Sequence, residues 1–310
     1  DHRDLHSFPT RRSSDLSDWL AQELPSARGT ERESEVLEEA VRRYVEARKL
    51  VDPDDPSAGP HAARLDGLAL SDLVHDLGLG LTARVVIGRD IRTEYMVGPD
   101  RVSQLMAGWM TSLHLTSGDG FEGYRIEGGN DRLATGLAER LGDRIRLDTA
   151  VSSLESDGTV VLASGDRLRG RRVIVTLPLP VLGRVWSAMP SSLGRAGYGI
   201  GGKISVQVAR RVWHDIGADG SVRTERAWGE FWETTDGQSG DTGVLTCLLS
   251  SDDGAALVSL PDAPTRVVRE MDRIFPGVHG LAGETVVTDW TNDPWSLGAY
   301  VTFGPGELLP

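Results

Sequence analysis

The sequence is poor in cysteine, in long apolar runs and in basic residues, and each shortage argues against a class of protein. One cysteine in 310 residues cannot form a disulfide within the chain. No apolar run reaches the length of a membrane-spanning helix, and no signal peptide opens the chain. Lysine and arginine number 33 against 46 aspartates and glutamates, and the net charge of −13 argues against binding to nucleic acid or to an anionic membrane. The sequence therefore predicts a reducing, cytoplasmic setting without a membrane or nucleic-acid partner.

Motifs for several kinds of chemistry are missing as well. The seven histidines show no metal-ligand spacing, and there is no Gly-x-Ser-x-Gly elbow for a serine nucleophile. Aromatic residues, 6% of the chain, are not interleaved with a basic patch. Residues 78–83 approximate a dinucleotide-binding glycine fingerprint, but helical character in Leu73–Leu77 just before them indicates a loop between helices. Cys247 lies in the apolar run Val244–Leu249, which is typical of a buried strand thiol rather than a nucleophile.

The first sixteen residues differ from the rest of the chain. Residues 1–16 show no helical or strand period, and they reproduce in order the translation of a common short-read sequencing adapter. We expect this segment to be non-native, with the natural sequence entering at about Ser17 and its true N-terminus missing. The whole sequence is 39% apolar and 25% charged, and it is long enough for one large or two medium globular domains.

From Ser17 to about Thr116 the pattern is mostly helical. Apolar residues recur every three to four positions within residues 33–50, as on one face of a helix. Residues 53–60, rich in Asp, Pro, Ser and Gly, predict a loop, and Ser71 with Asp72 predicts a helix start. Further helices are predicted over residues 81–96, 101–115, 131–141 and 265–274.

Later in the chain, short strands alternate with turn signals. Lys203–Val208 alternates polar and apolar residues, the pattern of a half-buried strand. Residues 157–158 and 164–166 are typical hairpin turns, and Gly128 with Gly129 predicts a tight turn. The order of helical, mixed and sheet-rich segments predicts an α+β fold with two interleaved domains. Further strands are predicted at residues 124–127, 145–147, 151–154, 160–162, 173–176, near Phe231, at 244–249 and at 285–290.

Three blocks of sequence follow one another in a recognisable order. The first runs from Tyr124 to Leu182, with Ile-Glu-Gly-Gly near its start and Thr-Leu-Pro-Leu-Pro near its end. The second is the Gly-Ile-Gly-Gly-Lys-Ile-Ser-Val stretch of residues 199–206, followed by Val-Trp at 212–213. The third is the Trp-Thr-Asn-Asp-Pro-Trp-Ser-Leu-Gly-Ala-Tyr stretch of residues 290–300. Together they resemble the FAD-dependent amine oxidase family, strongly from Tyr124 onward and weakly in the helical segment before it.

The resemblance implies an FAD-linked-reductase-type fold and a division of the chain. Residues 17–116 would form the helical part of a substrate domain, and residues 197–289 its sheet part. Residues 117–196 would be the central segment of the FAD-binding domain, and residues 290–310 the start of the return to it. The family's N-terminal glycine fingerprint and its last flavin-binding segment have no counterpart in the sequence. We therefore expect a fold truncated at both ends, and a chain that as given is inactive and does not hold FAD tightly.

The resemblance also assigns roles to particular residues. The lysine that matches Lys203 holds a water beside the flavin, and the tyrosine that matches Tyr300 is one wall of an aromatic cage around the substrate amine. Ala299 stands where members with covalent flavin carry cysteine, which implies non-covalently bound FAD. Further residues are matched to positions on or near the cofactor: Val151, Thr176, Pro178 and Trp290.

The implied activity is oxidation of a primary or secondary amine, or of a polyamine, to an imine that hydrolyses to an aldehyde or ketone. Molecular oxygen would be reduced to hydrogen peroxide. Two alternatives stay open. An L-amino-acid oxidase of the same fold would need a cation for the substrate carboxylate, such as Arg84 or Arg92, and the fold would also suit a binding module without catalysis. A homodimer is left open as the assembly.

Overall fold

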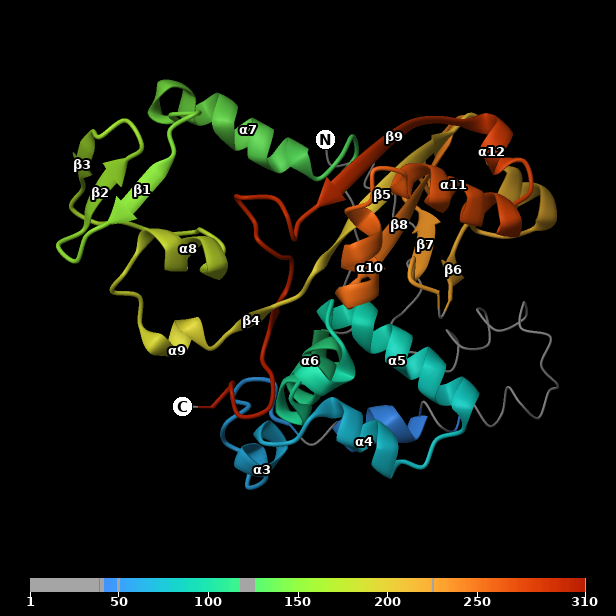
Figure 1. Ribbon diagram of the computed structural model, residues 1–310, viewed down its shortest axis with the longest axis horizontal. Coiled ribbons are helices and arrows are strands. Elements are labelled where there is room, and N and C mark those ends of the chain that lie inside the picture. The colour runs from blue at the N-terminus through green and yellow to red at the C-terminus, as the bar shows by residue number, and fades with distance from the viewer. Residues whose placement is uncertain (1–38, 40–41, 49–50, 118–125, 225, 310) are drawn as a thin grey trace, which may run out of the picture.

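The computed structural model describes residues 39, 42–48, 51–117, 126–224 and 226–309 and shows an α+β protein, which confirms the predicted class (Figure 1). Residues 1–16 and most of the predicted helix over residues 33–50 lie outside the described residues, although residues 42–48 are helical. The predicted strand at residues 124–127 also lies outside them, except for Ile126 and Glu127, which are not in a strand. Among the described helices, none has the length and apolar character needed to cross a membrane.

The helical part of the chain confirms the predictions made for it. Its core is built from side chains such as Leu70, Ile87 and Ile91, which are at most 2% exposed. The Asp72 carboxylate accepts the backbone N–H of Ala69 at 3.0 Å, which fixes a helix start close to the predicted one. The elements are α3 (Ala62–Asp66), α4 (Leu70–Asp76), α5 (Leu81–Tyr95), η1 (Pro99–Arg101) and α6 (Gln104–Ser117).

A mixed segment follows. Both predicted hairpin turns are confirmed, because β1, β2 and β3 form an antiparallel meander with Gly158 and Gly165 at positive φ between the strands. Gly128 and Gly129 also have positive φ, as a tight turn before a helix requires. The elements are α7 (Asp131–Leu141), η3 (Gly142–Arg144), β1 (Val151–Leu154), β2 (Thr159–Leu162), β3 (Arg167–Arg169), α8 (Leu179–Val185) and α9 (Ser191–Gly194).

Two predicted strands in this segment are wrong. Residues 145–147 and 173–176 are not in strands, although most of their side chains are apolar and either β-branched or long. A strand needs a neighbour that completes its backbone hydrogen bonds, and none of the described strands pairs with either stretch. Their side chains consequently lie open: Leu147 is 80% exposed and Ile174 is 88% exposed.

A five-stranded sheet with the order β6-β7-β8-β5-β9 follows, and it confirms the strands predicted at residues 203–208, around Phe231, at 244–249 and at 285–290. A separate two-stranded sheet pairs β4 (Gly197–Tyr198) with β10 (Val301–Thr302). The other elements are β5 (Gly201–Val208), η4 (Val212–Ile216), β6 (Val222–Arg223), β7 (Glu230–Glu233), β8 (Gly243–Ser250), α10 (Ser251–Val258), α11 (Ala263–Ile274), α12 (Val278–Leu281) and β9 (Ala282–Asp289).

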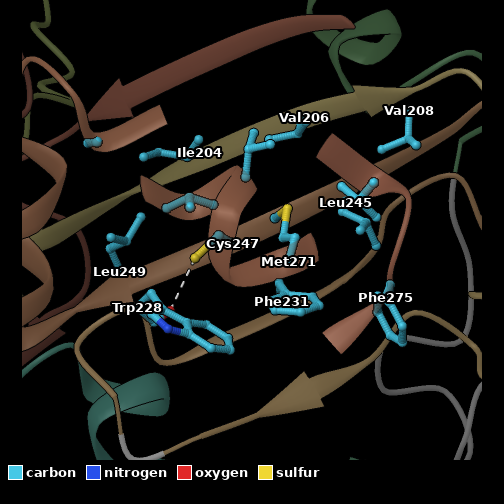
Figure 2. Close-up of a cluster of buried hydrophobic side chains, with 14 of the residues drawn as sticks. Ile204, Val206, Val208, Trp228, Phe231, Leu245, Cys247, Leu249, Met271 and Phe275 are labelled. Carbon is cyan, nitrogen blue, oxygen red and sulfur yellow. Dashed lines mark hydrogen bonds between the residues drawn. The ribbon is translucent and has the colours of Figure 1, made fainter. Parts of the chain in front are cut away.

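One face of this sheet forms the larger core (Figure 2). Ile204, Val206 and Val208 of β5 are all 0% exposed and point to the face that α10 and α11 cover, as the alternation predicts. Cys247 lies among them, and its thiol donates to the Trp228 carbonyl at 3.1 Å. Burial raises the pKa of the Cys247 thiol far above its ordinary value, so this residue is the inert buried thiol that was predicted.

The last segment of the chain connects the parts of the molecule. In Figure 1, β1–β3 with α7–α9 lie on the left, the five-stranded sheet on the upper right and the helical part below that sheet. The C-terminal segment, drawn in red, descends from β9 between these groups. Near its end the backbone N–H of Gly306 donates to the carbonyl of Asp66, and the N–H of Leu309 donates to the Asp66 carboxylate. The end of the described chain is therefore held against α3 of the helical part, although the two are far apart in the sequence.

Candidate active site

Lys203 lies near the start of β5, on the sheet face opposite to the apolar core. Its ammonium nitrogen is 5.4 Å from the ring centroid of Trp232 and 5.5 Å from that of Trp290, within the range of a cation–π interaction. The side chain is half-buried, and this burial lowers the pKa of Lys203 from its ordinary value, while the negative charge of Glu230 opposes the change. The site therefore presents a partly desolvated cation between two indole rings.

The loop of residues 290–300 is folded onto the strand that carries this lysine. The N–H of Gly201 donates to the Thr291 hydroxyl at 2.8 Å. Gly199 forms two backbone hydrogen bonds with the other end of the loop: its carbonyl accepts the N–H of Ala299 at 2.9 Å, and its N–H donates to the carbonyl of Tyr300 at 2.7 Å. Lys203, Trp290, Ala299 and Tyr300 are thus brought into one region, although they come from distant parts of the chain.

A glycine makes this close approach geometrically feasible. Gly298 has φ +140°, a conformation that side-chain-bearing residues rarely adopt, and a Cβ at this position would lie 2.9 Å from the carbonyl oxygen of Gly199. Its own N–H donates to the carbonyl of Trp290 at 2.8 Å, which closes the loop on itself. The Gly-Ala-Tyr sequence therefore has a structural reason, because glycine permits the turn that sets Ala299 and Tyr300 beside β5.

The remaining predicted cofactor residues lie farther from Lys203. Pro178 precedes α8, and the N–H of the next residue, Leu179, donates to the Tyr198 hydroxyl at 3.1 Å, which links this turn to β4 and so to the region of Gly298. Thr176 is exposed, and Val151 is the first residue of β1, paired with Leu162. Since no contact joins Thr176 or Val151 to the lysine, their roles in cofactor binding stay predictions.

Sequence reasoning missed two residues on the lysine's side of the sheet, Trp232 and Glu230, and one arginine, Arg89, that reaches the sheet region at Gly229. Trp232 and Glu230 alternate along β7 on the face that carries Lys203, as the strand pairing through β8 shows. Arg89 extends from α5, is only 7% exposed, and donates to the carbonyl of Arg226 at 2.6 Å. The Glu-Phe-Trp-Glu alternation of β7 was visible in the sequence, but its register against β5 was not.

The two arginines considered for a substrate carboxylate lie elsewhere on α5. Arg84 is exposed, and Arg92 donates to the carbonyl of Gly88 within its own helix. Arg89 is the arginine of this helix that contacts the sheet region, because a Cβ on Gly229 would lie 2.9 Å from its guanidinium. If a carboxylate-binding cation exists here, the geometry favours Arg89 over Arg84 and Arg92.

The fold and the site define an α+β protein in which a lysine-bearing strand of the five-stranded sheet meets an aromatic loop. The profile of the flavin-containing amine oxidoreductase family matches residues 32–309. The chain belongs to this family. The recognised resemblance is thereby confirmed, while the role of each site residue stays a prediction.

Individual relatives are distant. A nicotine dehydrogenase of Pseudomonas putida is 26% identical over 268 residues, which cover 83% of this chain and 54% of that protein. A flavin-dependent L-tryptophan oxidase of Lentzea aerocolonigenes is 28% identical over 196 residues, covering 57% of this chain and 41% of that protein. The chain therefore spans about half the length of these relatives or less.

Solved structures share the fold. Putrescine oxidase bound to putrescine superposes with a TM-score of 0.77 at 21% identity, over 91% of this chain and 67% of that one. Cyclohexylamine oxidase from Brevibacterium oxydans gives a TM-score of 0.73 at 20% identity, over 88% of this chain and 64% of that one. At these identities the likeness shows an FAD-dependent amine oxidase fold and nothing about the substrate.

The residues beside Lys203 fit one end of FAD. Trp290 is partly exposed beside the Lys203 ammonium, and the partly exposed Ala299 and the 44% exposed Tyr300 lie in the loop that is hydrogen-bonded just before the strand of that lysine. A flat, electron-poor ring system packs well on exposed aromatic side chains, and a nearby cation favours the negative charge that the ring gains on reduction. These residues would hold the flavin ring system.

Proposed function

We propose that the whole protein containing this chain is an FAD-dependent amine oxidase that converts a primary or secondary amine to an imine, with oxygen reduced to hydrogen peroxide. The observation that carries this proposal is the position of Lys203 between Trp232 and Trp290, with the Ala299–Tyr300 turn hydrogen-bonded to Gly199, just before the strand of Lys203. Family membership supports the class of chemistry, while the oxygen acceptor and the amine class are our inference.

Bound FAD would supply the redox chemistry by accepting the hydrogen of the carbon next to the amine nitrogen. The protein's own residues orient and desolvate the reacting groups. The Tyr300 ring would hold the neutral amine by its face, and the indoles of Trp232 and Trp290 would limit the access of water. The Lys203 ammonium would bind a water molecule and stabilise the negative charge that develops when oxygen is reduced.

Several finer points belong to the same proposal. Ala299 has no nucleophilic atom, so we propose that FAD is held without a covalent bond. We also propose the division of the chain into residues 17–116, 117–196, 197–289 and 290–310, a cytoplasmic setting and an amine as the small-molecule partner. The net charge of −13 supports the absence of nucleic-acid and anionic-membrane partners in this proposal.

A second candidate is favoured by Arg89. This buried cation lies next to Gly229, immediately before the strand that carries Glu230 and Trp232, and a carboxylate-bearing substrate would need a cation on this side of the site. An L-tryptophan oxidase is among the relatives. The second candidate is therefore an L-amino-acid oxidase of the same fold, with Arg89 as the cation.

The test uses the whole protein purified with FAD. Peroxide release is measured with monoamines, a diamine, a secondary amine and L-amino acids, and Arg89→Met separates the candidates. Oxidation of amines that Arg89→Met leaves unchanged supports the amine oxidase, while activity confined to amino acids and lost in Arg89→Met supports the second candidate. Reduction of the flavin by amines without peroxide release would make the protein a dehydrogenase and overturn the oxygen step.

Acid precipitation should release all FAD into solution, and flavin retained in the pellet would contradict the proposed non-covalent binding.

A further inference from the structure

One row of residues crosses the five-stranded sheet beside the candidate site. Lys203 of β5 is paired with Leu248 of β8, and Leu248 is paired in turn with Glu230 of β7. Residues directly opposite each other on neighbouring strands point to the same face. Lys203 and Glu230 therefore project from the same face, with their backbones two strand spacings, roughly 10 Å, apart.

Both charged side chains lie where water is scarce. Glu230 is only 9% exposed, and Lys203 is half-buried between the rings of Trp232 and Trp290. Opposite charges at this separation interact appreciably when the intervening medium is protein rather than bulk water. The carboxylate consequently opposes the effect of burial on the pKa of Lys203, as the structure indicates.

Charged side chains of α5 and α10 also lie near the sheet. α5 carries the cations Arg89 and Arg92; burial and the charge of Arg92 lower the pKa of Arg89, and Glu230 and Asp253, at the start of α10, oppose this change. α10 itself covers the opposite face, since a Cβ on Gly254 would meet the backbone of Leu249 in the apolar core. Among the described residues, Glu230 is the carboxylate whose charge acts on Lys203.

The choice of lysine at this position is unusual for the chain. Of its 33 basic residues only Lys49 and Lys203 are lysines, so 31 are arginines. A guanidinium stays charged at any pH that a protein survives, whereas an ammonium loses its proton when burial is not balanced by a negative charge. At this half-buried position the charge of a lysine, unlike that of an arginine, therefore depends on its surroundings, and a neighbouring carboxylate favours the charged form.

We propose that Glu230 is a positioning residue for Lys203, which it keeps charged and directed along the sheet face between Trp232 and Trp290. The consequence for oxygen reduction rests on the function proposed above. The interaction between Glu230 and Lys203 involves only residues of this chain and does not require flavin. Removal of the carboxylate leaves the effect of burial on the pKa of Lys203 unopposed. Lys203 then loses its charge at lower pH.

The titration of Lys203 tests this directly in the 310-residue chain, without flavin. Lysine labelled with ¹³C at the ε carbon gives two resonances, and Lys49→Arg identifies the one that belongs to Lys203. In Glu230→Gln we expect the titration midpoint of Lys203 to fall by about one pH unit, the order of magnitude for a charge at this separation. Glu230→Asp retains the charge and should restore most of the difference.

Glu284→Gln is the matched control, because it removes the same charge from an exposed position on β9 of the same sheet. The titration midpoint of Lys203 in this variant should equal that in the chain without substitutions. A midpoint in Glu230→Gln that stays within about 0.2 pH units of the control would overturn the proposal, as would an equal shift in both variants. A Glu230→Asp variant that behaves like Glu230→Gln would also overturn it, because the effect would then depend on shape and not on charge.

The same variants in the FAD-loaded whole protein show whether the interaction matters for turnover. The alkaline limb of flavin reoxidation should move to lower pH in Glu230→Gln by the same amount as the Lys203 midpoint, and it should stay in place in Glu284→Gln. A shifted titration midpoint can be accompanied by a reoxidation rate that changes neither with pH nor on replacement of Lys203. In that case the proposed role of the lysine in oxygen reduction fails, but its interaction with Glu230 stands. If the titration midpoint of Lys203 does not shift, the proposed interaction with Glu230 fails and the proposed function is unaffected.

Discussion

At the scale of single residues, the properties of Lys203 follow from three neighbours. Two indole rings remove water from the ammonium, and a carboxylate on the next strand but one opposes the fall in its pKa that this burial causes. An exposed lysine would have neither constraint. This combination of partial desolvation with a compensating charge is typical of lysines that act on a reacting group.

Replacement of this lysine should separate the two halves of the proposed reaction. We expect Lys203→Met to slow flavin reoxidation by oxygen by about tenfold or more, because a preorganised cation stabilises charge developing on oxygen, and to slow reduction by amine much less. Stopped-flow traces of each half-reaction measure both. Gln207→Met, an exposed position on the same face of β5, is the control. Equal slowing of the two half-reactions would make Lys203 a structural residue.

Tyr300 permits a test of ring face against hydroxyl. We expect Tyr300→Ala to lower kcat/KM for amines by about tenfold to a few hundredfold, since the ring face contributes roughly 1–3 kcal/mol through contact and orientation. Tyr300→Phe keeps the ring and should be mild. Steady-state kinetics with one amine series decides the matter. If the phenylalanine variant loses as much as the alanine variant, the hydroxyl is the working group and the cage assignment is wrong.

At the scale of elements, the sequence predicted those whose signal is local. β5 was predicted from alternation, because one of its faces is buried, and the helices predicted at residues 131–141 and 265–274 match α7 and α11 closely. The strands expected at residues 145–147 and 173–176 were wrong, since apolar and β-branched residues favour a strand only where a neighbouring strand pairs with them. Composition indicated which stretches favour a strand, but it could not show which of them would be paired.

The same distinction applies to the candidate site. Lys203, Trp290 and Tyr300 were recognised from motifs, and the structure brings their segments together through Gly199 and Gly201. Trp232 and Glu230 could not be recognised, because their place beside Lys203 depends on the register of β7 and β8 against β5. Residues that meet by long-range pairing leave no local pattern in the sequence.

The loop of residues 290–300 offers a prediction about one glycine. We expect Gly298→Ala to lower the free energy of unfolding by about 1–3 kcal/mol and to displace Tyr300, because the new Cβ would collide with the Gly199 carbonyl in a backbone conformation unfavourable to alanine. Gly280→Ala is the control, since no atom lies within 4 Å of its added Cβ and its φ is not in the left-handed region. Urea unfolding of both variants provides the comparison. A Gly298→Ala variant as stable as the control would mean that the turn does not need glycine.

At the scale of the whole molecule, one surface is unusually apolar. Leu133, Leu137 and Leu141 lie four residues apart on α7 and therefore on one side of the helix, and they are 63%, 53% and 45% exposed. Ile174, which is 88% exposed, adds to the exposed apolar side chains of the same mixed segment. A monomeric soluble protein rarely leaves such side chains in water without a partner. This α7 face is therefore unlike the surface of an isolated domain, whose large apolar side chains are mostly enclosed in one core.

This α7 face should bind hydrophobic dye and promote self-association. We expect the double variant Leu133→Gln, Leu137→Gln to reduce the fluorescence of bound 1-anilinonaphthalene-8-sulfonate severalfold and to shift concentrated samples toward the monomer in light scattering, because it removes two of the three leucines of the face. The melting temperature should change little, since neither side chain is buried in the fold. Thr135→Gln with Glu139→Gln, exposed positions on the other side of α7, is the matched control and should leave dye binding unchanged. Equal dye binding in both double variants would place the accessible apolar surface elsewhere, whereas a large fall in melting temperature on removing the leucines would show that they are packed in solution.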